Sequence, residues 1–177
     1  MAILFGLLTG LLILGIYGLT LPKNVSFNRT IIIQSAPQTI YPFLEDLTCF
    51  AQWNAWIDRD PTMTLKFTGA PGELDSTFSW KGNRQVGQGM ITLQDKVLNK
   101  SVTYGLTFGK NTHASCSLHL EPHEESCIVT WAFNNTIGFN PFLRAMGHVF
   151  KKIIAKDYEV GLQKLKLMVE VSNSNKE

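Results

Sequence analysis

An apolar stripe with the period of an α-helix runs through the last part of the chain, and it restricts the possible fold more than any other feature. Its members, which recur every three or four positions, are Leu143, Met146, Val149, Phe150, Ile153, Ile154, Tyr158, Leu162, Leu165 and Val169. This spacing predicts a helix of roughly 28 residues. Such a helix is about 40 Å long, and its own sequence could not stabilise it unaided in water. We therefore expect it to lie on a large apolar surface.

Residues 63–135 supply such a surface, because they read as a series of short strands. Apolar and polar side chains alternate along them, most clearly over residues 101–108 and 113–120. Turn residues rich in glycine, such as 69–72 and 81–83, separate the runs. A strand with one apolar and one polar face is typical of an antiparallel meander that is packed on one side only.

Further elements precede the meander. Residues 25–34 are β-branched and partly alternating, which predicts a strand. Pro37 suits the first turn of a short helix over residues 37–46, and residues 50–57 predict a second short helix or a turn. The predicted fold class is therefore α+β: an antiparallel sheet of about seven strands curved around a long C-terminal helix, with two short helices after the first strand.

The start of the chain has a different character. From Ala2 to Leu21 no side chain is charged, and roughly 20 helical residues span the ~30 Å core of a bilayer. The stretch lacks the basic start and the small-x-small cleavage site of a secretory signal, so an uncleaved transmembrane anchor is favoured over a cleaved signal. The expected segments are an anchor over 1–22, one domain over 23–171 and a polar tail over 172–177.

Charge and cysteine content suggest a location. Lys23 and Arg29 follow the apolar stretch, and basic residues favour the cytoplasmic side of a membrane. Cys49, Cys116 and Cys127 form an odd set without metal-type spacing, which agrees with a reducing compartment. We expect a single-pass membrane protein with its domain in the cytoplasm. The net charge of +2 is too small to indicate a nucleic acid as partner.

Several segments extend this interpretation to a family. They are RTIIIQSAPQTIYPFLEDL, FAQWNAWIDRDP, GELDSTFSWKGN, GQGMITL, IVTWAF and KDYEVGLQKLKLMVE. In content and order they resemble the polyketide cyclase/dehydrase-like branch of the START/Bet v 1-like (SRPBCC) superfamily, over residues 25–171. The resemblance implies a helix-grip fold that encloses a hydrophobic cavity between sheet and helix. It also implies a lipid, sterol, quinone or polyketide as the type of ligand, but no specific chemistry.

Inward-facing side chains would line such a cavity. The predicted ligand-binding residues are Phe78, Trp80, Tyr104, Phe108, Trp131 and Phe133 from the strands, with Met146 and Phe150 from the helix. Tyr158 faces the same way. The alternative is that these side chains fill a solid core. Tyr104 is the most informative polar candidate, because a buried phenol needs a hydrogen-bond partner that a ligand could supply.

Groups for acid–base or metal chemistry form a weaker pattern. Asp58, Asp60 and Glu73 are expected in loops at the cavity rim, where a buried carboxylate could act as general base in an aldol-type cyclisation. His113 and His119 fall on the polar face of one strand, and the histidines and cysteines lack the spacing of a metal site. No cofactor, metal or catalytic residue is predicted.

The family resemblance and the sequence patterns together leave three functions open. The favoured one is membrane-tethered binding or transfer of a hydrophobic small molecule, without catalysis. The alternatives are a cyclase or dehydratase acting on a polyketide-like substrate, and a protein-interaction module without a functional cavity. The sequence does not specify the ligand, a protein partner or the oligomeric state.

Overall fold

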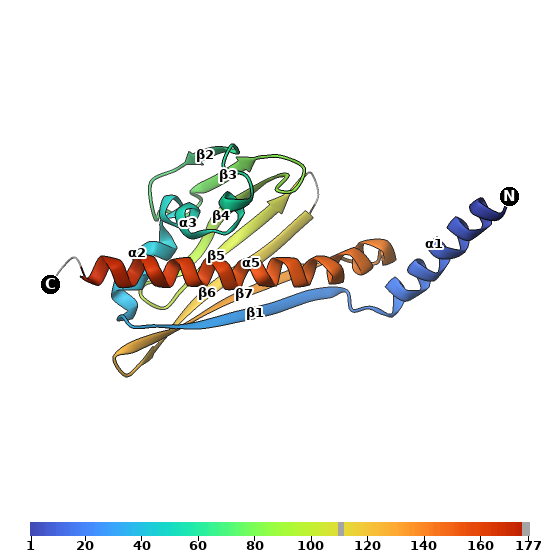
Figure 1. Ribbon diagram of the computed structural model, residues 1–177. Helices are drawn as coiled ribbons and strands as arrows, with labels where there is room; N and C mark the ends of the chain where they lie inside the picture. Colours follow the sequence, from blue (N-terminus) through green and yellow to red (C-terminus); the bar gives the residue numbers. More distant parts are fainter. Residues whose placement is uncertain (110–111, 175–177) are drawn as a thin grey trace.

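A seven-stranded antiparallel sheet forms the centre of the molecule in the computed structural model, which describes residues 1–109 and 112–174 (Figure 1). Its strands are β1 (Asn24–Ile33), β2 (Thr64–Thr68), β3 (Thr77–Lys81), β4 (Gln88–Val97), β5 (Ser101–Phe108), β6 (Thr112–His123) and β7 (Ser126–Thr136). The order across the sheet is β1-β7-β6-β5-β4-β3-β2. Strands β2 to β7 therefore follow one another as a meander, and the first strand joins beside the last. The predicted antiparallel meander is confirmed.

The pairing of β1 with β7 places the two ends of the folded domain together. It runs from Asn24 opposite Thr136 to Ile33 opposite Cys127. Beyond the strand ends, the backbone N–H of Ile137 donates to the carbonyl of Lys23 at 2.9 Å. The chain thus enters β1 close to the point where it leaves β7. We call this place, formed by residues 23–25 and 135–137, the β1 corner, and it forms one side of the candidate site.

Helix α5 (Pro141–Ser174) lies across one face of the sheet (Figure 1). This confirms the helix-grip arrangement, although the helix has 34 residues and the stripe predicted roughly 28. It begins early because the side chain of Asn140 accepts hydrogen bonds from the N–H groups of Phe142 and Leu143, which satisfies its free N-terminal donors. It also includes residues 172–174 of the expected polar tail, whereas residues 175–177 lie outside the described part of the chain.

Short helices α2 (Pro37–Glu45), α3 (Leu47–Trp53) and α4 (Trp56–Arg59) cover the sheet beside α5. Two short helices were predicted, with the second over residues 50–57. That segment divides at Asn54, whose backbone is extended and whose side chain accepts a hydrogen bond from the N–H of Trp56 at 2.9 Å. Asparagine side chains commonly compete with helical hydrogen bonds in this way.

The predicted membrane anchor is wrong. Helix α1 (Ala2–Thr20) projects from the rest of the protein, and its last turns lie against the start of α5 (Figure 1). Over residues 1–109 and 112–174, no helix combines the length and the apolar character needed to cross a membrane. The expected single-pass membrane location, with the domain in the cytoplasm, depended on that span and is therefore withdrawn.

Candidate functional site

One half of the space between sheet and α5 is filled by aromatic side chains. The rings of Trp131 and Tyr158 stack with centroids 3.7 Å apart, and Trp53 meets Trp131 edge-on at 5.1 Å. Gly161 makes this packing possible, since an added Cβ would lie 3.0 Å from the Trp131 ring. Close-packed rings of this kind leave no room for a ligand, so this closed half acts as core.

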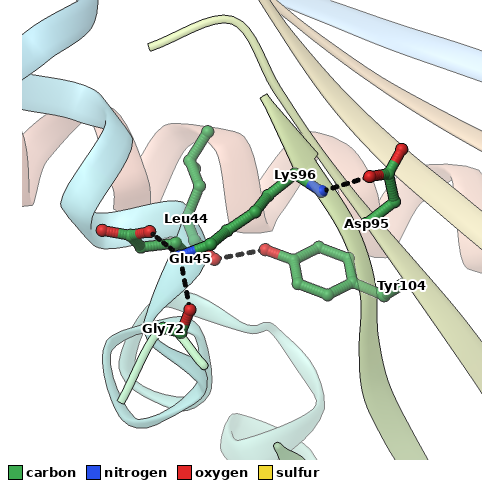
Figure 2. A network of polar contacts seen from close by, with 6 residues as sticks. All are labelled: Leu44, Glu45, Gly72, Asp95, Lys96 and Tyr104. Atoms are coloured by element: carbon green, nitrogen blue, oxygen red, sulfur yellow. Dashed lines mark hydrogen bonds and ion pairs between the residues drawn. The ribbon is translucent and has the colours of Figure 1, made fainter. Parts of the chain in front are cut away.

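Tyr104 belongs to the closed half. Its hydroxyl is fully buried and donates a hydrogen bond to the carbonyl of Leu44 in α2 (Figure 2). Close by, the Lys96 ammonium binds Glu45 at 2.8 Å and the carbonyl of Gly72, which ties α2 to β4 (Figure 2). The protein itself therefore supplies the partner that the phenol of Tyr104 requires.

Titratable groups in the closed half stay neutral. Burial raises the pKa of the Cys116 thiol to about 11, and it raises the pKa values of Tyr104 and Tyr158 well above their ordinary range. A thiol that remains protonated at neutral pH is a poor nucleophile and metal ligand. We assign these three groups a packing role.

A pocket of about 480 Å³ occupies the other half, between the end of the sheet and the first half of α5. The sheet side and the following segment supply Val25, Phe108, His113, Phe133, Asn135, Thr136 and Ile137. The helix supplies Leu143, Met146, Gly147, Phe150 and Ile154. Most of these side chains are apolar, and the polar ones all come from the sheet side.

Helix α5 approaches the sheet side closely at one point of this half, while the lining residues around that point stay exposed. At Gly147 the helix approaches the β1 corner so closely that an added Cβ would lie 2.2 Å from the Ile137 side chain. The neighbouring lining residues Leu143, Met146 and Phe150 remain 54%, 45% and 47% exposed. Apolar side chains that face a cavity and remain half exposed indicate a pocket that is accessible from solvent.

The comparisons with known proteins identify the family. Residues 24–170 match the family described as polyketide cyclase / dehydrase and lipid transport. The chain belongs to this family. No curated protein matches the sequence.

Three solved structures share the family's fold. A Staphylococcus aureus protein of unknown function has a TM-score of 0.65 at 10% identity, covering 85% of this chain and 96% of that chain. The di-domain ARO/CYC StfQ from the steffimycin biosynthetic pathway has a TM-score of 0.63 at 12% identity, covering 85% of this chain and 52% of StfQ. Ara h 8.0201 has a TM-score of 0.57 at 9% identity, covering 84% and 99%. Identities this low establish the fold alone.

The residues predicted from sequence to bind ligand divide between the two halves. Phe108, Phe133, Met146 and Phe150 line the pocket. Tyr104 and Trp131 lie in the closed half described above. Phe78 stacks on Phe67 with centroids 5.1 Å apart, and Trp80 packs against Trp56 and Phe108 at 5.1 and 5.9 Å. In this member of the polyketide cyclase / dehydrase and lipid transport family, half of the residues predicted to bind ligand thus lie together in the pocket wall.

The prediction missed other lining residues. Asn135 follows Trp131 and Phe133 at alternate positions of β7, so the period of the strand could have identified it. His113 was assigned to the polar face of its strand, yet at the strand end it reaches the rim of the pocket. Gly147 has no side chain to signal its position, although it interrupts the apolar stripe of the helix.

The carboxylates considered for catalysis lie away from the pocket. Asp58 pairs with Lys164 at 2.9 Å, and the Glu73 carboxylate accepts a hydrogen bond from the backbone of Ala70. Asp60 is buried under a turn, where hydrogen bonds from Thr62 and from the backbone of Asn83 lower the pKa of its carboxyl. These groups stabilise loops, and the pocket lining includes none of them.

Asp157 provides a test of the contact between α4 and α5. Arg59 donates a hydrogen bond to its carboxylate, but burial outweighs this partner and raises the pKa of Asp157. The folded state then holds the proton more tightly than the unfolded state, so this group lowers the free energy of unfolding as pH rises through the window just above its ordinary pKa. An Asp157→Asn variant has no such titration. Its free energy of unfolding, relative to the parent, should increase between pH 3.5 and pH 7 in urea denaturation, and a relative decrease would contradict the direction of the shift.

Proposed function

We propose that the protein binds or transfers a hydrophobic small molecule, which occupies the pocket between the sheet and the first half of α5. The strongest support is the pocket itself, because about 480 Å³ with mainly apolar walls falls within the ~300–1,000 Å³ range of small-molecule sites. The family description, which includes lipid transport, is consistent with such a ligand. Phe108, Phe133, Met146 and Phe150 are the residues predicted from sequence that we propose to contact it.

Binding without catalysis is the form of the proposal that the lining favours. Among the described residues that line the pocket, His113 is the one titratable side chain, and it is exposed at the rim. A cyclase or dehydratase requires an acid or base within hydrogen-bond reach of the reacting atoms. The interaction-module alternative assumed that there was no cavity, which a pocket of this size does not favour.

The proposal is tested with the full chain. The purified protein is extracted with organic solvent, the extract is analysed by mass spectrometry, and the stripped protein is titrated with the uncharged fluorophore N-phenyl-1-naphthylamine. We expect saturable binding that alkylbenzenes displace. Each methylene added to the alkyl chain contributes about 0.8 kcal/mol of favourable transfer free energy when it is buried. The affinity of the alkylbenzene should therefore rise about fourfold per methylene until the pocket is full. Binding that never saturates, or that does not respond to chain length, would contradict the proposal.

A further inference from the structure

The rim of the pocket is polar on one side and apolar on the other. His113, Asn135 and Thr136 contribute polar groups from the sheet, whereas Leu143, Met146 and Phe150 face them from α5 with apolar groups. A ligand in this pocket therefore meets hydrogen-bonding groups along one edge only. The chemical class inferred below rests on the proposed function and makes it more specific.

Asn135 is the polar group that is placed furthest inward. Its neighbours at alternate positions of β7, Trp131 and Phe133, are buried on the face of the sheet that meets α5. In register it lies between Val25 of β1 and Ala114 of β6, so its amide extends from the middle of three paired strands. Side chains two residues apart on a strand share a face, which directs this amide toward the pocket that it lines.

The amide of Asn135 is accessible to a ligand in the pocket. Asn135 is half-buried and lines the pocket, so water can reach its side chain while the pocket is empty. An amide can both donate and accept, and a polar group covered by an apolar ligand without a partner loses its hydrogen bonds to water. A purely hydrocarbon ligand would impose this loss on Asn135, whereas a ligand oxygen placed at the amide would avoid it.

The charges around the pocket favour a neutral oxygen. His113 is the one lining group that can carry a positive charge, and it lies at the exposed rim, where its Nδ1 is 3.5 Å from the hydroxyl of Thr107. A carboxylate that moved into this pocket would lose its hydration without meeting a lysine or arginine among the described lining residues. A hydroxyl or carbonyl group avoids that penalty.

We propose that the ligand is an uncharged amphiphile, with an apolar ring or chain against Phe133 and Phe150 and one hydroxyl or carbonyl oxygen hydrogen-bonded to the Asn135 amide. A matched pair of probes, 2-naphthol and 2-methylnaphthalene, tests this, because they differ in a single oxygen that replaces a methyl group. The anion 2-naphthoate tests the charge. All three are titrated at neutral pH against the full chain and an Asn135→Leu variant, which replaces the amide with an apolar side chain of similar size.

The expected result is a change in preference between the paired probes. In Asn135→Leu the affinity ratio of 2-naphthol to 2-methylnaphthalene should fall about tenfold, since the hydroxyl then loses its partner. An Asn134→Leu variant is the matched control, because Asn134 is the exposed neighbour on the other face of β7. It should leave the ratio unchanged, and an Asn135→Ala variant should reproduce the loss if the leucine disturbs folding.

The outcomes separate this inference from the proposed function. Equal ratios in the parent and both Asn135 variants, with all probes bound, would overturn the inference and leave the pocket as a general hydrophobic site. Binding of 2-naphthoate more tightly than 2-naphthol would overturn the choice of a neutral ligand. Absence of saturable binding for every probe would overturn the proposed function itself.

Discussion

Replacing Trp131 with alanine is expected to lower the free energy of unfolding by about 3–5 kcal/mol, the range for a buried tryptophan in a close-packed core. Trp131 is 2% exposed, stacks on Tyr158 and makes edge contacts with Trp53 and Phe50 at 5.1 and 5.8 Å. Truncation would leave a cavity between the sheet and α5 that these rings cannot fill without leaving their own contacts. Urea denaturation followed by far-ultraviolet circular dichroism measures the loss, because that signal comes mainly from the backbone and not from the tryptophan removed.

Phe150→Ala is the matched control from the open half. Phe150 lies on the same helix as Tyr158 but is 47% exposed in the pocket wall. Its truncation removes fewer contacts and should cost about 1–2 kcal/mol. If the two variants were destabilised equally, the division of the interior into a closed and an open half would be wrong.

Local periodicity carried most of the fold prediction. The alternation of apolar and polar residues over 101–108 corresponds to β5, and the stripe from Leu143 to Val169 corresponds to α5. These patterns show which side of each helix or strand is apolar. Each apolar side must pack against another element, and only a few arrangements of layers achieve this. The limits of α5 were less accessible, because they depend on the cap formed by Asn140 and on contacts such as that between Asn173 and Ser35.

Composition alone misjudged the first helix. Residues 2–21 lack charged side chains, a composition that predicts a membrane span. The helix that forms ends at Thr20 and packs its last turns against α5, where Gly18 meets the backbone of Pro141. This contact involves residues far along the chain, so the composition of residues 2–21 alone could not predict it.

Only half of the residues predicted to bind ligand line the pocket. The alternation along a strand predicts which face of the sheet a side chain is on, but not whether neighbouring side chains fill the space beside it. Trp131 and Phe133 face the same side of β7, yet one packs under Tyr158 and the other lines a pocket. The difference depends on partners distant in the sequence: Trp53 closes one end, and Gly147 sets the approach of α5 at the other. For Tyr104, a ligand was one possible hydrogen-bond partner of the phenol, and the carbonyl of Leu44 accepts that hydrogen bond instead.

Placing a carboxylate in the pocket wall is expected to abolish most ligand binding without unfolding the protein. Met146 lines the pocket and is 45% exposed, so in a Met146→Glu variant the charge can remain hydrated while the pocket is empty. A hydrophobic ligand would strip water from that carboxylate. A penalty of at least about 2 kcal/mol, or about thirtyfold in affinity, follows from the cost of burying an unpaired charge.

Val149→Glu is the matched control, since Val149 is on the same helix, is 61% exposed and does not line the pocket. Both variants add one negative charge to α5. Their affinities for N-phenyl-1-naphthylamine should therefore differ only if the probe binds in the pocket. Lowering the pH should restore affinity in Met146→Glu alone, because protonation removes the charge that the ligand must desolvate. Equal losses in the two variants would instead place the bound probe on the exposed apolar surface of α1 and α5, and the pocket would no longer explain binding.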